Sequence, residues 1–96
     1  MKVKDWFDAL SDMGCIVCLN EHGVVSQPDI HHLTSGSKRI GDLQTIPLCP
    51  THHRFGVNNS FAVSRHPWKR EFERRYGTEA ELYAQVLKLV TESTAS

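Results

Sequence analysis

The sequence predicts a small α+β fold in which a middle rich in cysteine and histidine lies between helices at the two ends. Helical apolar spacing marks both ends, and two short strand-like runs occupy the middle. All three cysteines and all six histidines lie between residues 15 and 66. A chain of 96 residues has a thin core, because it buries only about 60–65% of the surface that it exposes when unfolded. We expect one domain over residues 1–96: an N-terminal helix in 1–13, a metal-stabilised core in 14–66 and C-terminal helices in 67–92.

The composition is that of a folded, soluble protein, with 40% hydrophobic and 23% charged residues. No apolar run approaches the roughly 18–20 residues of a membrane span, and the acidic, amphipathic start "MKVKDWFDAL" is unlike a signal peptide. We therefore expect a cytoplasmic protein without membrane association. An odd number of cysteines without a secretion signal favours metal or thiol chemistry over a disulfide framework.

The net charge is zero, but the charges are unevenly distributed. Residues 31–76 carry eight basic and three acidic side chains, whereas residues 1–30 carry two basic and five acidic ones and residues 77–96 one basic and three acidic ones. The positive excess therefore coincides with the histidine-rich segment, which favours an anionic partner.

The first half of the chain contains a predicted helix and two predicted strands. Apolar residues at helical spacing predict a helix over residues 3–13 that Gly14 ends: Val3, Trp6, Phe7, Leu10 and Met13. The stretch "CIVCLNEHG" (15–23) predicts a tight cysteine turn followed by a loop. The runs "VVSQPDIHHLTS" (24–35) and "DLQTIPLC" (42–49) predict two strands that pair as a hairpin through a long, irregular loop.

Three helices are predicted in the second half. "PTHHRFG" (50–56) begins with a proline suited to a first helical turn and ends at Gly56, so its helix is short. In residues 67–77, four-residue spacing places Trp68, Phe72 and Tyr76 on one helix face. Thr78 and Glu81 have capping-box spacing. The apolar stripe of the last helix consists of Leu82, Val86, Leu89 and Val90, and we expect the tail "TESTAS" (91–96) to be frayed.

Four side chains have the spacing of a structural zinc site. Cys15 and Cys18 are separated by two residues, as are Cys49 and His52, and 30 residues lie between the two pairs. Three thiolates and one imidazole form an ordinary tetrahedral ligand set that leaves no open position for chemistry. The alternative is that the three cysteines are unrelated buried residues. A bound metal ion, however, would add stability to a protein with so thin a core.

The remaining histidines could form a second site. Consecutive strand residues point to opposite faces, so His31 and His32 can meet at one edge only at a bulge or a strand end. His53 diverges from His52 by about 100° on the helix, which directs it away from the zinc ligands. Phosphodiester cleavage requires a base near neutral pH, a cation and positive charge for the backbone. The alternative is that these histidines are satisfied polar residues or a second structural zinc site.

The stretches "CIVC", "DIHHLTSG", "GDLQTIPLCPTHHRFG" and "SRHPWKREFERRYGTEAELYAQV" resemble the HNH, or ββα-metal, endonucleases. The resemblance covers about residues 14–90 and is greatest to the phage recombination-enhancement nucleases, which act on DNA together with RecA filaments. It implies a zinc-stabilised ββα-metal core that hydrolyses DNA as an endonuclease or nickase, in the cytoplasm of a bacterial host. The alternative is a zinc-stabilised DNA-binding or recombination accessory module with a degenerate nuclease centre.

The resemblance also implies a role for each candidate residue. His32 matches the general base. His31, His53 and His66 would hold the catalytic metal, which would be magnesium or manganese, and zinc could replace it. Asp42 stands near the place of the family's middle asparagine, which ties the loop between the strands. The side chains that would contact the phosphate at the centre are Arg54 and Arg65, and those that would bind the DNA backbone are Lys38, Arg39, Lys69 and Arg70.

Overall fold

The computed structural model describes residues 1–95; Ser96, the end of the tail expected to be frayed, lies outside the described residues. The fold is α+β, as predicted. Its elements are α1 (Val3–Met13), α2 (Ile16–His22), β1 (Asp29–His32), β2 (Thr34–Ser35), β3 (Lys38–Arg39), β4 (Thr45–Leu48), α3 (Pro50–His53), α4 (Lys69–Tyr76) and α5 (Glu79–Ala95). Within residues 1–95, no helix combines the length and the apolar character that a membrane crossing requires.

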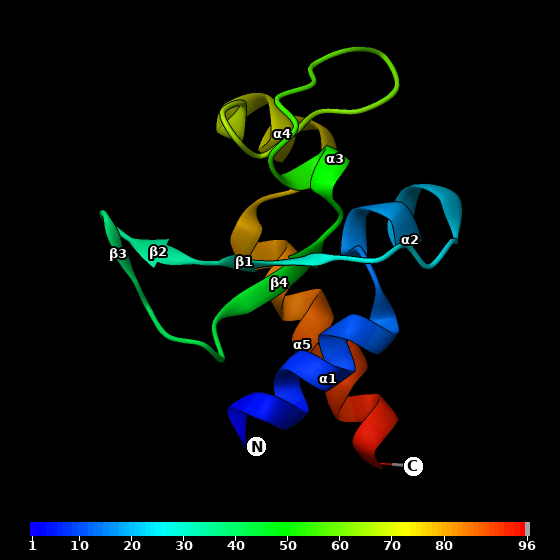
Figure 1. The fold of residues 1–96 in the computed structure, drawn as a ribbon, viewed down its shortest axis with the longest axis vertical. Helices are drawn as coiled ribbons and strands as arrows, with labels where there is room; N and C mark the ends of the chain where they lie inside the picture. The colour runs from blue at the N-terminus through cyan, green and yellow to red at the C-terminus, as the bar shows by residue number, and fades with distance from the viewer. Residues whose placement is uncertain (96) are drawn as a thin grey trace.

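A two-stranded antiparallel sheet of β1 and β4 lies at the centre of the molecule (Figure 1). Its register pairs His31 with Ile46 and His32 with Thr45, which confirms the expected strand pair. The long connection between the strands contains a second, smaller hairpin of β2 and β3. This hairpin protrudes from the body of the molecule (Figure 1), in the segment that was expected to be an irregular loop.

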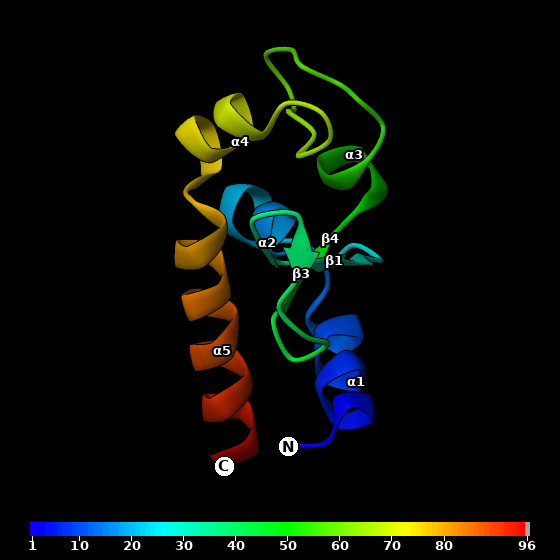
Figure 2. The ribbon, with the colours of Figure 1, turned by 90° about the vertical axis from the view of Figure 1, so that its left-hand side faces the viewer.

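The core lies where α1, α2 and α5 pack against β4. All four residues of β4 are buried, and so are Leu10 of α1, Ile16 of α2 and Val86 of α5. Trp6 is also buried and donates a hydrogen bond from Nε1 to Thr45 Oγ1 over 2.8 Å. In Figure 2, α5 runs along one side of the molecule while α1 lies across from its C-terminal half. The short helices α3 and α4 lie at the other end, beyond the sheet (Figure 1).

The segment after the first cysteine is a helix and not the expected loop. Cys15 caps α2, because its Sγ accepts a hydrogen bond from the backbone N–H of Cys18 over 3.4 Å. Gly23 ends the helix in the left-handed conformation with φ 66°, and its N–H bonds to Leu19 O over 3.0 Å. A helix of seven residues is too short for apolar periodicity to reveal.

The C-terminal helices follow the prediction with two exceptions. Thr78 and Glu81 form the expected capping box, in which Thr78 Oγ1 accepts from Glu81 N over 3.1 Å and Glu81 Oε1 accepts from Thr78 N over 3.0 Å. The helix that it opens continues to Ala95, so the expectation of a frayed tail is wrong as far as residue 95. Trp68 precedes α4 and is 43% exposed, whereas Phe72 is fully buried. The predicted common face of α4 therefore does not include Trp68.

Gly14 joins α1 to the cysteine turn in a conformation that favours glycine. Its φ is +78°, and a Cβ added there would stand 2.8 Å from the backbone oxygen of Ser26. The same oxygen accepts the N–H of Cys15 over 3.0 Å. The close approach of these two backbone segments therefore requires the absence of a side chain at residue 14.

We expect Gly14→Ala to lower the free energy of unfolding by at least about 2 kcal/mol, because the substitution adds both backbone strain and a steric clash. Gly41→Ala is the matched control, since Gly41 has no positive φ and no atom lies within 4 Å of an added Cβ. Chemical denaturation in the presence of zinc and a thiol reductant measures both variants. Equal stability of the two variants would contradict this account of Gly14.

Candidate functional site

The three cysteines and His52 converge in a buried group beside the sheet. Cys15 and Cys18 come from the start of α2, Cys49 precedes α3, and His52 lies within α3. His52 Nδ1 lies 3.7, 3.5 and 3.2 Å from the sulfurs of Cys15, Cys18 and Cys49, and the sulfurs of Cys18 and Cys49 lie 3.7 Å apart. Ligands around a tetrahedral zinc ion stand roughly 3.5–3.8 Å apart. The group could therefore hold a zinc-like metal ion.

The environment of this group also suits a cation. Burial raises the pKa of the Cys15 thiol to about 12 and also raises the pKa of Cys18. Burial lowers the pKa of His52, which favours the neutral imidazole. A metal ion supplies the positive charge that stabilises buried thiolates, and a neutral imidazole offers it a lone pair. The donor set and its burial therefore fit a closed metal site.

A second group consists of His31, His53 and His66. One ligand nitrogen from each lies within 4.8 Å of the others. His31 Nδ1 and His53 Nε2 are 3.3 Å apart, and the three ring centroids form a triangle with sides of 5.1–5.3 Å. Imidazole nitrogens that share one ion at about 2.0–2.1 Å lie roughly 3.0–3.4 Å apart. The structure thus brings together the three predicted ligands of the catalytic metal in a geometry that one ion can bridge.

Two carboxylates lie against the rings of this group. His53 Nδ1 lies 3.0 Å from Asp29 Oδ2, so its Nε2 remains free to face the other histidines. The buried Nε2 of His31 has no hydrogen bond among the described residues and lies 3.4 Å from Glu79 Oε1. A hydrogen bond to a carboxylate, such as that of His53 with Asp29, fixes the ring orientation and the tautomer of a metal-binding histidine.

The same carboxylates also pair with arginines. Arg54 Nε donates to Asp29 over 2.8 Å, and Arg65 Nε donates to Glu79. Burial works to raise the pKa of both acids, but the partners outweigh it. Hydrogen bonds from His53 and Arg54 hold the pKa of Asp29 below its usual range. His31 and Arg65 lower the pKa of Glu79 to about 2. Both groups are therefore carboxylates near neutral pH.

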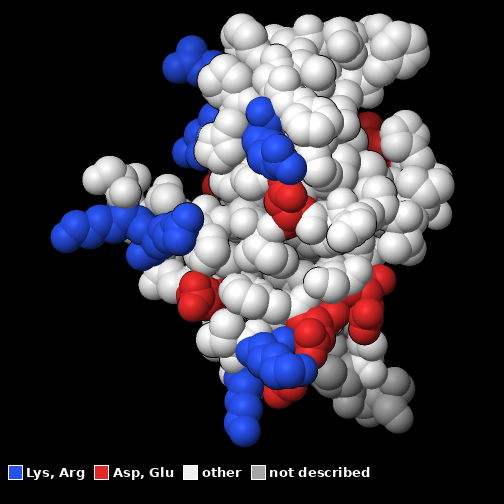
Figure 3. All heavy atoms as spheres, in the orientation of Figure 1, with Lys and Arg blue, Asp and Glu red and all other residues white. Residues whose placement is uncertain are grey.

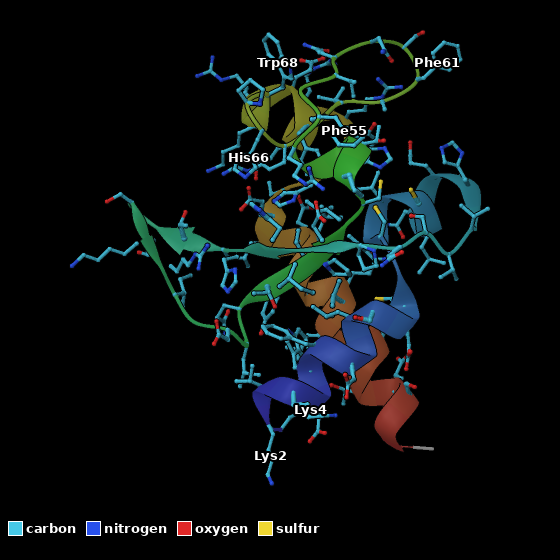
Figure 4. All side chains as sticks on the ribbon, in the orientation of Figure 1. Lys2, Lys4, Phe55, Phe61, His66 and Trp68 are labelled. Carbon is cyan, nitrogen blue, oxygen red and sulfur yellow. The ribbon has the colours of Figure 1, made fainter. Side chains whose placement is uncertain are left out.

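Backbone hydrogen bonds fix His66 beside α3. The N–H of Arg65 bonds to His52 O and the N–H of His66 to His53 O, each over 2.9 Å. In Figure 4, His66 lies between α4 and β1. Burial lowers the pKa of His66, and the adjacent Arg65 cation lowers it further. The imidazole is therefore largely neutral near pH 7, as a metal ligand must be.

His32, the predicted general base, lies at the end of β1 and has a carboxylate partner of its own. Its Nε2 is 3.0 Å from Asp42 Oδ1, and its side chain is 17% exposed. Although His31 and His32 are consecutive strand residues, both line one pocket of about 230 Å³. The other lining residues are Ile30, Thr34, Arg39, His53, Arg65 and His66. The strand end thus gives both histidines access to the same space.

The predicted DNA contacts fall into two classes. Arg54 and Arg65 are engaged with Asp29 and Glu79, and the Arg65 side chain is only 14% exposed. The other four make no ion pair within residues 1–95 and are exposed: Lys38 and Arg39 on β3, and Lys69 and Arg70 at the start of α4. Figure 3 shows Lys and Arg atoms on the protruding hairpin and at the edge where α4 lies.

No pattern in the sequence predicts roles for Asp29 and Glu79. Asp29 stands two residues before His31, where a carboxylate preceding a histidine pair is only a weak signal. Glu79 lies in the first turn of α5 and is 9% exposed, but in the sequence it looks like an ordinary acidic residue of a helix N-terminus. Only the tertiary structure shows that each carboxylate contacts a histidine of the group.

We expect Glu79→Gln to lower the free energy of unfolding at neutral pH by about 3 kcal/mol, because the variant leaves the Arg65 cation buried without a counter-charge. The loss relative to the native chain should disappear at acid pH. The pKa of Glu79 is about 2 in the folded chain against 4.5 for a free glutamate, so its stabilising effect is present above pH 4.5 and is lost as the pH falls toward 2.

Denaturation of the native chain and of Glu79→Gln between pH 2 and 7 measures this difference. Glu92→Gln is the control, because Glu92 is exposed on α5 and lies 4.0 Å from Lys88, so its loss should cost less than about 0.5 kcal/mol. Equal losses for the two variants would show that the buried pair does not stabilise the fold.

Comparison with known proteins agrees with this geometry. A family model described as recombination enhancement, RecA-dependent nuclease matches residues 2–91. No match was found among curated proteins. The matched range spans nearly the whole chain. It contains the group of three cysteines and His52, the group of three histidines, the carboxylates Asp29 and Glu79, and the exposed basic residues. The chain belongs to the recombination-enhancement, RecA-dependent nuclease family.

Proposed function

We propose that this protein is a metal-dependent endonuclease that hydrolyses phosphodiester bonds of DNA, with β1, β4 and α3 as a ββα-metal core of the HNH type. One observation carries the proposal: the imidazoles of His31, His53 and His66 converge within 4.8 Å and line the same pocket as His32. A metal site beside a free base is the arrangement that hydrolysis of a phosphodiester requires. The name of the family supports a nuclease that acts in recombination.

His32 would act as the general base. Its Nε2 faces the Asp42 carboxylate at 3.0 Å, which favours the tautomer with the proton on Nε2 and leaves Nδ1 free to accept a proton from water. The carboxylate also stabilises the imidazolium that forms when Nδ1 takes that proton. Asp42 would therefore position the base without touching the substrate.

The three-histidine group would hold the catalytic ion. A divalent ion bound there supplies Lewis-acid stabilisation of the charge that develops on the phosphate and the leaving oxygen. We propose magnesium or manganese as the working ion. Because the group offers nitrogen donors, it also suits zinc, which could compete for the site. Asp29 and Glu79 would keep His53 and His31 turned toward the ion.

The group of three cysteines and His52 would hold a structural zinc ion. With four protein ligands it has no open position, so its role would be to join α2 to the start of α3. This junction matters for the active site because His53 is the next residue after His52 and is carried on the same short helix.

DNA would contact the face that carries the exposed cations. Lys38 and Arg39 extend from the β2–β3 hairpin, and Arg39 also lines the histidine pocket. Such contacts hold phosphates without reading the base sequence. From the name of the family we further propose that a RecA filament on DNA is the partner. Arg54 and Arg65 would then help to neutralise the phosphate at the centre.

Cleavage of supercoiled plasmid DNA with magnesium or manganese tests this function. We expect His32→Ala to reduce the cleavage rate by about 10²–10⁴-fold, the usual contribution of a general base, while DNA binding remains. His22→Ala is the matched control, since His22 is exposed on α2 and does not line the pocket, and it should cut like the native chain.

The assay should be run with and without RecA filaments, because a nuclease that depends on RecA would cut only in their presence. Equal cleavage by the native chain and His32→Ala would exclude the role given to His32. DNA binding by the native chain without cleavage under any of these conditions would instead favour the accessory module with a degenerate nuclease centre.

A further inference from the structure

We infer that Trp68, together with Lys69 and Arg70, forms a subsite for an unstacked nucleobase and its flanking phosphate. The inference rests on the proposed function in taking DNA as the ligand, and it adds a base-binding site that the metal centre does not require. Trp68 is exposed beside Lys69 and Arg70. The proposed hydrolysis does not need this tryptophan, and phosphate binding by the basic residues does not need it either.

The exposed phenylalanine and tryptophan rings of the described chain are confined to one segment. Phe55, Phe61 and Trp68 are 60%, 86% and 43% exposed, and the other large hydrophobic residues with exposed side chains are aliphatic. Figure 4 shows the three rings at the end of the molecule opposite to Lys2 and Lys4. Single exposed apolar residues are common on protein surfaces, but three aromatic rings within fourteen residues, flanked by cations, are typical of surfaces that bind single-stranded nucleic acid.

Trp68 is held in place while part of its ring stays accessible. Its Nε1 donates to the backbone oxygen of Gly56 over 2.9 Å, so one edge of the indole is fixed. The ring lines a surface hollow of about 340 Å³ together with Asn58, Pro67, Lys69, Arg70 and Glu71. A fixed aromatic ring loses little conformational entropy when a base stacks on it, which favours binding.

The two neighbouring cations are free to bind a phosphate. Lys69 and Arg70 make no ion pair within residues 1–95, whereas Arg74, one turn further along α4, pairs with Glu71. Both side chains are exposed and line the same hollow as Trp68. The hollow therefore offers an aromatic surface for a base and positive charge for the adjoining backbone.

The subsite lies next to the proposed metal centre. Trp68 follows His66 by two residues, which limits the separation of their Cα atoms to about 7 Å, or about two base steps of B-DNA. The hydrogen bond from His66 N to His53 O, of 2.9 Å, fixes this segment against α3. A base held on Trp68 would thus lie within a few nucleotides of the scissile phosphate, and it would have to be single-stranded or extruded from a duplex.

Binding of short DNA strands to the full, zinc-loaded chain without added magnesium or manganese tests the inference. The probes are an oligothymidylate and a strand of equal length in which every base is absent, so that both carry the same phosphates. Tryptophan fluorescence reports directly on the subsite, because the other tryptophan, Trp6, is only 3% exposed. Anisotropy of labelled strands gives the affinities.

We expect the native chain to bind oligothymidylate about 5- to 150-fold more tightly than the abasic strand, which corresponds to the contribution of one stacked base. Trp68→Ala should lose that preference and bind both strands as the native chain binds the abasic one. Trp68→Phe keeps a ring and should retain most of the preference, but it should lose the fluorescence quenching. Lys69→Gln and Arg70→Gln should weaken binding to both strands alike.

Two control variants match these changes. Leu87→Ala removes a side chain of similar exposure, 44%, from α5, and Lys2→Gln removes an exposed cation at the opposite end of the molecule (Figure 4). Neither should alter the preference for the strand with bases. Thermal denaturation of each variant shows whether it is folded.

Tryptophan quenching by a perfect duplex and by a duplex with one mismatch shows whether the bound base comes from single-stranded DNA or is extruded from a duplex. Quenching by the single strand and by the mismatched duplex would show that the subsite accepts an extruded base, and quenching by the single strand alone would restrict it to single-stranded DNA. Equal affinity of the native chain for the strands with and without bases, or unchanged affinity of Trp68→Ala for oligothymidylate, would overturn the inference. Because cleavage is not measured, a failed nuclease assay leaves this result interpretable.

Discussion

The convergence of Cys15, Cys18, Cys49 and His52 is the constraint on which the rest of the site depends. The helix α3 has only four residues, too few to be stable by itself, and two of the four converging side chains lie at its start and within it. The next residue, His53, points about 100° away from His52 around the helix axis, and its side chain lies beside His31 and His66. A metal ion in the cysteine group would therefore hold α3 in the orientation that lets His53 meet His31 and His66.

A layer of paired carboxylates connects this centre to the remainder of the fold. Asp29 links His53 to Arg54, and Glu79 links the His31 ring to Arg65. Glu79, at the start of α5, thereby connects the C-terminal helices to His31 of the central sheet. Asp29 and Glu79 each pair with an arginine, which limits the cost of burying these charges. The same pairing turns the imidazole nitrogens toward the space between the rings, so stability and function depend on the same contacts.

The features that could be predicted from the sequence are those with a short-range signal. The apolar spacing of α1, the capping box of Thr78 and Glu81, and the two-residue separation of the cysteine and histidine pairs all depend on near neighbours. The structure reproduces them. By contrast, α2 is too short for periodicity, the roles of Asp29 and Glu79 depend on tertiary contacts, and Trp68 is exposed because it precedes its helix. The convergence of His31, His53 and His66 was expected only from the family resemblance, since no local pattern requires it.

Anomalous diffraction from crystals grown with zinc and soaked with manganese tests the assignment of the two metal sites, because it locates each metal independently of activity. We expect a zinc peak within ligand distance of Cys15, Cys18, Cys49 and His52, and a manganese peak within ligand distance of His31, His53 and His66. The absence of metal from the cysteine group, or manganese bound away from the three histidines, would contradict it.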